Sequence, residues 1–350
     1  MFNLTYQRVG SRLRLRLAGA VLSGALLVAC ATANNREAAD AAAPLVWPPA
    51  PAEPRVRFVQ NIVGPLSIGQ SASVLRRFSN FLIGDSGERE NLVKPFGVAL
   101  DEAGNLCVTD MGAGAVCYCD FRKKKWQRWF AAGKTRFAAP VAVARRNGVF
   151  YVADSELGKV LAFREDGRSE LEIAAPLQRP VGVAIAGDSL FVADSQAHAV
   201  FVFDLRGQLR FQFGKRGAGA GEFNFPTHIS ADGRGQLFVT DSLNSRVQVF
   251  DEQGRFQSQI GSAGDTSGHF GRPKGAAADT FGHLYVADAV YDNVQVFALS
   301  GGLLLNWGQA GTGPGEFGMP GGVVISPGNQ IYVADSFNHR VQVFQYLGQP

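Results

Sequence analysis

A short phrase recurs six times along this chain of 350 residues: an aromatic residue or cysteine, then Val-Ala-Asp or Val-Thr-Asp. Successive copies lie 44, 40, 47, 47 and 47 residues apart, and they end at Asp110, Asp154, Asp194, Asp241, Asp288 and Asp335. Repeats of this length are typical of propellers and solenoids, in which one supersecondary unit is copied along the chain. The repeat therefore constrains the fold more than any single segment does.

Each repeat has the composition of four short strands. It opens at a proline (Pro95, Pro140, Pro180, Pro226, Pro273 or Pro320) and continues through apolar runs divided by Gly-containing turns. In the fourth repeat we expect strands over 228–231, 236–241, 245–251 and 256–261. Such runs predict an antiparallel meander. Six four-stranded units predict an all-β fold, a six-bladed β-propeller.

The last repeat stops at Pro350, soon after its third strand, while an extra strand-like segment lies at 55–63. We expect this N-terminal strand to pair with the last blade and close the ring, which removes exposed strand edges. Between it and the first repeat, Val74, Leu75, Phe78, Phe81 and Leu82 fall at helical spacing. Residues 73–83 are thus predicted to form a short amphipathic helix that caps the ring.

The first 29 residues have the pattern of a signal peptide. Arg8, Arg12, Arg14 and Arg16 precede an apolar run of 13 residues, too short to span a bilayer as a helix. These arginines account for the whole basic excess: without them the chain has 30 basic and 30 acidic residues. A general nucleic-acid-binding surface needs a basic excess, so we predict no nucleic-acid partner.

The segment Leu27-Val-Ala-Cys30 resembles the lipobox of bacterial lipoproteins. The resemblance implies cleavage before Cys30 and lipidation of Cys30, which would anchor the protein to a membrane; an ordinary signal peptide with an incidental cysteine is the alternative. Ala31 follows, a pattern that resembles lipoproteins of the outer membrane facing the periplasm in diderm bacteria. Residues 30–54 are then an Ala/Pro-rich linker, and residues 55–350 the propeller.

The repeats resemble the NHL family. The motifs that carry the resemblance are a Pro-x-Gly-Val opener, Tyr-Val-Ala-Asp, Ser-x-Asn-x-Arg-Val-Gln-Val-Phe and connectors with Gly-Glu-Phe-x-x-Pro at 221–226 and 315–320. The resemblance covers residues 90–347 and implies a six-bladed propeller. It implies little about function, since this fold carries binding scaffolds and enzymes alike.

The six repeat aspartates have two readings. They could form a ring that binds a cation, or each could accept backbone N–H bonds in the turn that follows its strand. Arg246 and Arg340 are available as partners in the fourth and sixth repeats. We favour the structural role.

The histidines test an enzymatic reading. The NHL resemblance raises peptidyl-α-hydroxyglycine lyases, which hold zinc with histidines on inner strands. Zinc needs three or four converging ligands. The inner-strand position two residues after each opening proline holds Gly97, Ala142, Gly182, His228, Gly275 and Gly322. His228 is therefore a single candidate for a binding site. His198, His269, His283 and His339 fall on different turns and connectors, and we predict no metal or cofactor, with a channel metal as the alternative.

Two further groups of residues are candidates for partner binding. The densest basic cluster contains Arg122, Lys123, Lys124, Lys125, Trp126 and Arg128, which could contact anionic lipid, polyanionic glycan or an acidic partner. The alternative is a solvated turn with tryptophans packed between blades. The connectors 215–225 and 309–319 lie where propellers expose loops, and they contribute Lys215, Arg216, Glu222 and Glu316.

The chain has three cysteines besides Cys30. By alignment with the fourth repeat, Cys107 takes the place of Phe238 and Cys119 that of Phe250, which we expect to lie opposite each other. An exported protein meets an oxidising compartment, so a Cys107–Cys119 disulfide is predicted. Three small buried apolar side chains are the alternative.

These features favour a membrane-tethered, non-catalytic binding scaffold of the bacterial cell envelope, whose loops bind a protein or an envelope polymer. The alternative is a propeller hydrolase or lyase with a metal in the central channel. That alternative needs at least two more ligands beside His228 on the inner strands.

Overall fold

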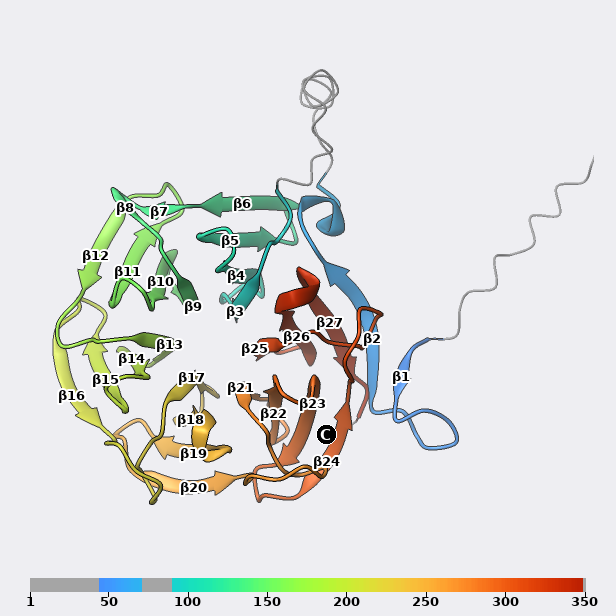
Figure 1. Cartoon of the computed structure of the whole chain (residues 1–350). Coiled ribbons are helices and arrows are strands. Elements are labelled where there is room, and N and C mark those ends of the chain that lie inside the picture. Colours follow the sequence, from blue (N-terminus) through green and yellow to red (C-terminus); the bar gives the residue numbers. More distant parts are fainter. Residues whose placement is uncertain (1–43, 71–89, 349–350) are drawn as a thin grey trace, which may run out of the picture. The chain divides into compact units, whose positions relative to one another are not determined.

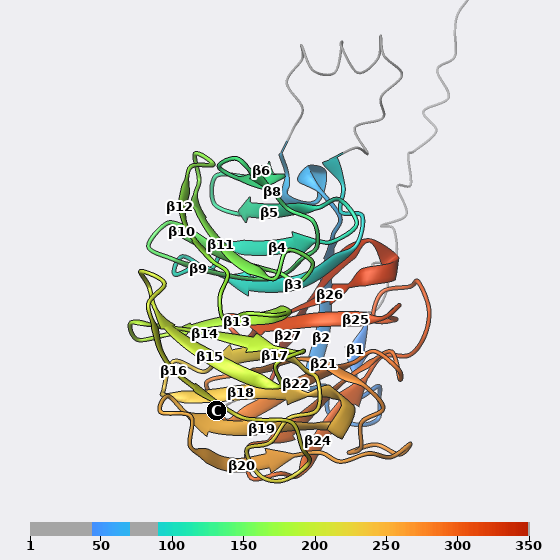
Figure 2. The ribbon, with the colours of Figure 1, turned by 60° about the vertical axis from the view of Figure 1, so that its left-hand side comes forward.

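The computed structural model describes residues 44–70 and 90–348. Six antiparallel sheets are arranged around a central axis, with β3, β9, β13, β17, β21 and β25 nearest the axis (Figure 1). The predicted all-β, six-bladed propeller is confirmed. Figure 2 shows the first sheet from the side, with its four strands following one another outward.

The first three blades each contain four strands in chain order from the axis outward. Blade one is built from β3 (Pro95–Leu100), β4 (Leu106–Asp110), β5 (Ala115–Asp120) and β6 (Lys125–Trp129). Blade two is built from β9 (Pro140–Arg146), β10 (Val149–Asp154), β11 (Lys159–Arg164) and β12 (Ser169–Ile173). Blade three is built from β13 (Pro180–Ala186), β14 (Ser189–Asp194), β15 (Ala199–Asp204) and β16 (Leu209–Phe213).

The next two blades repeat this order. Blade four is built from β17 (Pro226–Ala231), β18 (Gln236–Asp241), β19 (Arg246–Asp251) and β20 (Phe256–Ile260), close to the strands expected for this repeat. Blade five is built from β21 (Pro273–Ala278), β22 (His283–Asp288), β23 (Asn293–Ala298) and β24 (Leu303–Trp307). The inner strands begin at the repeat prolines because a proline lacks the N–H that an interior ladder position would need.

Blade six closes the ring with a strand from the N-terminal side of the propeller. Its inner strands are β25 (Pro320–Ile325), β26 (Gln330–Asp335) and β27 (Arg340–Tyr346). The fourth is β2 (Val56–Ile62), which pairs antiparallel with β27, from Val56 opposite Tyr346 to Ile62 opposite Val341. Val56 and Ile62 are fully buried. The predicted closure is confirmed.

The propeller unit begins earlier than the predicted boundary at residue 55. β1 (Val46–Trp47) pairs with β2 and makes the last sheet five-stranded. Trp47 lies edge-to-face on Phe344, with ring centroids 5.7 Å apart. The compact unit starts at Pro44, so the last residues of the predicted linker belong to the propeller, because Trp47 is large enough to bury apolar area there.

The remaining described elements are short: the hairpin of β7 (Ala131–Ala132) and β8 (Thr135–Arg136), and the 3-10 turns η1 (Pro65–Ile68), η3 (Ser242–Asn244) and η4 (Ser336–Asn338). No helix among residues 44–70 and 90–348 is long and apolar enough to cross a membrane. The predicted signal peptide, Cys30 and the predicted helix over 73–83 lie outside the described residues.

The hydrophobic core lies between neighbouring blades. The Gly-Glu-Phe connectors explain part of it, because Phe223 and Phe317 are fully buried against Phe250 and Phe344, with centroids 5.6 and 6.0 Å apart. Burying such a ring contributes up to about 3 kcal/mol. Phe270 has the same role between blades four and five. The connector motif is thus a packing device that joins consecutive blades.

The small residues on the inner strands allow those strands to approach closely. A Cβ added at Gly182 would lie 2.8 Å from the backbone nitrogen of Ile229, and one at Gly275 would lie 2.7 Å from the carbonyl oxygen of Gly321. Neither neighbour is a flexible side-chain end, so a larger residue would force blades apart. The small residues at these positions are therefore a requirement of close packing between inner strands.

We predict that the chain without residues 1–63 loses its ring closure. Its β27 edge would expose a row of unpaired N–H and C=O groups, which promotes aggregation. Light scattering and thermal unfolding should show aggregation and a lower Tm than the matched chain that begins at Pro44 and keeps β1 and β2. A monomeric protein with an unchanged Tm would contradict the closing role of β2.

Candidate functional site

The six repeat aspartates are fully buried and hold the start of each blade in place. Each carboxylate accepts a backbone N–H from the connector that precedes its own blade; the connector donors are Val93 and Lys94 for Asp110, Ala138 and Ala139 for Asp154, Gln178 and Arg179 for Asp194, Asn224 for Asp241, Gly271 and Arg272 for Asp288, and Gly318 for Asp335. These donors lie in the connector before the blade, whereas we expected donors in the turn after the strand. The bonds agree with the structural role we favoured.

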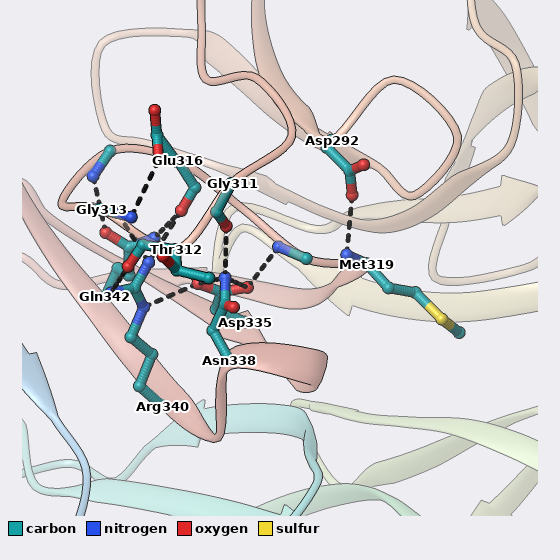
Figure 3. Close-up of polar contacts among 12 residues, drawn as sticks. Asp292, Gly311, Thr312, Gly313, Glu316, Met319, Asp335, Asn338, Arg340 and Gln342 are labelled. Carbon is teal, nitrogen blue, oxygen red and sulfur yellow. Dashed lines mark hydrogen bonds and ion pairs between the residues drawn. The ribbon is translucent and has the colours of Figure 1, made fainter.

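The two most regular repeats add charged and amide donors to this clamp, as Figure 3 shows for blade six. Arg340 Nε lies 2.7 Å from Asp335 Oδ2, while its other nitrogens bond the carbonyls of Thr312, Gly313 and Glu316. Asn338 and Gln342 complete the network around Asp335. The Ser-x-Asn-x-Arg-Val-Gln motif therefore ties one turn to one connector.

Blade four repeats the pattern, with Arg246 Nε 2.9 Å from Asp241. In blade one, Arg128 on the outer strand takes over as the partner of Asp110, also at 2.9 Å. In blades two, three and five the carboxylate instead accepts N–H bonds of its own turn, from Leu157, Ala197 and Val290 among others. The aspartate is thus constant while its extra partner varies.

His228 lies on β17 and borders a cavity of about 510 Å3 inside the ring of inner strands. Its Nδ1 faces the backbone N–H of Ala276 on the next blade at 3.4 Å. Burial lowers the pKa of His228 to about 4, so the ring is neutral at pH 7. With Nδ1 accepting, the proton of the neutral ring is on Nε2, which makes His228 a hydrogen-bond donor in the channel.

The other histidines lie apart from His228, each with local partners. His198 Nδ1 accepts the N–H of Phe225, His269 contacts Thr266, and His283 contacts Asp279 at 2.8 Å. Among residues 44–70 and 90–348, no three His, Cys, Asp or Glu side chains converge to hold a metal ion. The residues present do not fit the zinc site that the lyase resemblance would require.

A second cavity of about 470 Å3 lies at the end of the channel where the inner strands begin, and we call it the mouth pocket. It meets the same strands one residue earlier than the cavity of His228: Phe96 precedes Gly97, and Val141 precedes Ala142. Its lining is apolar at Phe96, Met111, Val141, Val181, Phe225 and Leu243. The polar remainder is Ser155, Arg179, Ser195, Thr227, Ser242, Arg272 and Lys274, which includes three cations and no acid.

Sequence reasoning missed the mouth pocket, although a signal was present. Lys94, Arg179 and Arg272 each stand directly before a repeat proline, and Lys274 stands directly after one. Equivalent positions of all repeats in a propeller surround the same end of the channel. Cations at equivalent positions of separate repeats therefore come close together. The overall charge balance hid this local excess.

The candidate residues of the connectors have structural contacts. Glu222 and Glu316 each accept a backbone N–H within their own connector, from Gly219 and Gly313 at 2.9 Å. Lys215 is exposed and lies 3.3 Å from Glu222. Arg216 is exposed and pairs through its backbone with Phe223. The two glutamates therefore shape the connectors, and the lysine and Arg216 remain on the surface.

The basic cluster divides into two parts. Arg122, Lys123 and Lys124 on the turn between β5 and β6, and Lys125 at the start of β6, are exposed, as a surface patch requires. Trp126 is buried in the core, and Arg128 is directed to Asp110. Their assignment to a binding patch is wrong, because alternate residues of β6 face the core side of the sheet.

The predicted Cys107–Cys119 disulfide is also wrong. Cys107 pairs with Tyr118 and Cys119 pairs with Leu106, so the two cysteines are one residue out of register and face opposite sides of the sheet. Cys107, Cys117 and Cys119 are free and fully buried. Burial raises the pKa of Cys117 to about 12, so the thiols are protonated apolar side chains.

Comparison with known families agrees with this architecture. Residues 317–344 match the NHL repeat, and residues 172–235 and 230–281 match a family described as a 6-bladed beta-propeller. The chain is therefore a six-bladed β-propeller in which residues 317–344 match the NHL repeat. No curated protein matches the sequence.

Solved structures of similar fold have diverse functions. A streptogramin B lyase is 11% identical over 73% of this chain and 94% of its own, with a TM-score of 0.55. A Bacteroides thetaiotaomicron protein of unknown function is 14% identical over 73% of this chain and 70% of its own, with a TM-score of 0.58. Kuenenia stuttgartiensis hydrazine synthase is 16% identical over 72% and 95%, with a TM-score of 0.52. At these identities the likeness shows the fold alone.

We predict that Asp241→Asn destabilises the protein by about 3–5 kcal/mol, because it leaves the buried Arg246 guanidinium without its counter-charge. Asp194→Asn is the matched control: it removes the same charge in a blade without an arginine partner and should cost about 1–3 kcal/mol. Urea unfolding measures both. Equal losses, or a larger loss for Asp194→Asn, would contradict the role of the buried pair.

We predict that His228 contributes to acid destabilisation. Its folded-state pKa lies near 4 and below the ordinary value of 6.5, so the unfolded chain binds a proton first as the pH falls, and stability is lost between pH 6.5 and 4. His228→Gln should reduce the loss between pH 7 and 4.5 by about 1–2 kcal/mol in urea unfolding. Parallel stability profiles of variant and wild type would contradict this, since they would show that folding leaves the pKa of His228 unchanged.

Proposed function

We propose that this protein is an exported, lipid-anchored and non-catalytic binding scaffold, which binds a protein or polymer of the cell envelope at the face around the mouth pocket. The anchor in this proposal is the lipid on Cys30, with residues 31–43 as a spacer. In a diderm host the location would be the outer membrane, facing the periplasm. The lipobox resemblance at 27–30 and the arginines before the apolar run support export and anchoring.

The observation that carries the binding role is a group of exposed apolar side chains on this face. Leu243, Val290 and Phe337 stand two residues after the repeat aspartates of blades four, five and six, and their side chains are 47%, 55% and 56% exposed. Phe225, 41% exposed, lines the mouth pocket together with Leu243. We call these four residues the apolar rim. Large apolar side chains that are exposed on one face mark interaction sites in soluble domains.

The apolar rim covers one half of the ring. The equivalent positions of blades one, two and three hold Gly112, Glu156 and Gln196, which present no large apolar side chain. The rim is therefore a local property of three repeats and not a requirement of the blade. Turns at the mouth of a propeller are free to vary because the blades support them, and this favours a role in binding.

The experiment is site-specific photocrosslinking in intact cells of the source organism. A photoreactive amino acid at Leu243 or Phe337 should give one discrete crosslinked band if the partner is a protein. If the partner is an envelope polymer, it should give a ladder of bands that a glycan-cleaving enzyme shortens. The matched control is the same residue at Leu209, which is 48% exposed on the outer strand β16. Adducts at Leu209 alone would contradict the assignment of the binding face.

A second measurement tests the anchor. Cells fed a fatty-acid analogue should label the wild-type protein, and Cys30→Ser should abolish the label and release the protein from the membrane fraction. An unlabelled wild-type protein would overturn the lipid anchor and leave the binding face to be judged from the crosslinks.

A further inference from the structure

The mouth pocket combines an apolar wall with cations that make no ion pair among the described residues. In the described part of the chain, the side chains of Arg179, Arg272 and Lys274 make no ion pair and no hydrogen bond. The nearby carboxylates are already engaged, since Asp194 and Asp288 accept the backbone N–H groups of Arg179 and Arg272. Three positive charges thus face one cavity with no lining acid.

Among the three cations, Lys274 gives the clearest argument for a bound anion. It is half-buried on the inner strand β21, and its backbone carbonyl accepts the Thr227 hydroxyl at 3.2 Å. Burial and the neighbouring Arg272 lower the pKa of Lys274, while Asp288 opposes that change. An ammonium removed from water without a partner costs free energy, which a bound anion would offset.

Ser242 supplies an independent observation at the same pocket. The equivalent hydroxyls of Ser195 and Ser336 donate to the carbonyls of Arg179 and Pro95, at 3.2 and 2.6 Å. Ser242 lines the mouth pocket, is 2% exposed, and its hydroxyl has no partner among the described residues. Buried polar groups in native proteins are nearly always bonded, so this hydroxyl lacks an acceptor that a ligand could provide.

We propose that the mouth pocket binds an organic anion, in which a carboxylate, sulfonate or phosphate group is joined to an apolar body. Arg272 and Lys274 hold the anionic group, Arg179 adds positive charge, and the Ser242 hydroxyl donates to it. The apolar body lies against Phe225 and Leu243. The volume of about 470 Å3 lies within the range of small-ligand sites. This inference rests on the proposed function, in that the anionic group belongs to what the scaffold binds.

The chemistry can be tested before the natural ligand is identified. The probe is 8-anilinonaphthalene-1-sulfonate, an apolar body with one sulfonate, followed by its fluorescence on the chain that begins at Pro44. Residues 44–348 contain the closed ring with its own core, so this chain contains the whole site. We expect saturable binding at one site per chain, weakened by added salt and by competing benzoate or inorganic phosphate.

The decisive variant is Arg272→Gln with Lys274→Gln, which should raise the Kd for the sulfonate probe at least tenfold. It should leave the Kd for N-phenyl-1-naphthylamine, an uncharged analogue, within twofold. The matched control is Arg122→Gln with Lys123→Gln, which removes the same charge from the exposed turn and should change neither Kd. Ser242→Ala should raise the Kd for the sulfonate probe severalfold.

Three outcomes would overturn the inference. The Kd for the sulfonate probe could be unchanged in the double variant, the control variant could raise it as much as the double variant does, or the double variant could raise the Kd for the uncharged analogue equally. The photocrosslinks at Leu243 and Phe337 test the proposed function, and their result does not depend on the probe-binding measurements. Crosslinks without anion binding would overturn only the ligand class. Anion binding without crosslinks would overturn the scaffold and leave a pocket for a small organic anion.

Discussion

The buried carboxylate at the end of each second strand is the interaction on which the rest of the structure depends. It joins the strand that carries it to the turn that follows and to the connector that precedes the opening proline of the same repeat, as Asp194 does in blade three. A buried charge is tolerable only when its hydrogen bonds are satisfied, and backbone N–H groups do this in every blade. The mouth pocket is lined by Met111, Ser155, Ser195 and Ser242, which directly follow four of these aspartates.

The clamp has a consequence for function. In blades three and five the carboxylates accept backbone N–H bonds, and the side chains of Arg179 and Arg272 beside them make no ion pair with them. Arg179 and Arg272 each donate a backbone N–H to an aspartate while their side chains remain at the mouth. The feature that stabilises the blade thus leaves a basic, apolar-walled pocket at its end. Variation in turn residues then decides what each blade contributes to the face.

Much of the fold was predictable from the sequence, and the errors share one cause. The repeat phrase, the prolines and the Gly-Glu-Phe connectors predicted blades, strand order and ring closure, because they encode local turns and burial. The prediction of a Cys107–Cys119 disulfide was wrong because the two cysteines are one residue out of register. Trp126 and Arg128 failed because composition does not tell which face of β6 a residue occupies. A shift of one residue reverses the face of every side chain.

The sequence by itself determined the number of blades, the position of each aspartate clamp and the closing strand, since these follow from periodicity, turn chemistry and strand-edge pairing. Only the tertiary structure decided that Arg179, Arg272, Lys274 and Ser242 share one pocket, and that His228 stands without further ligands in the described channel. The physical reason is that a propeller brings equivalent positions of distant repeats around one axis, so its site is made by ring closure and not by any contiguous motif.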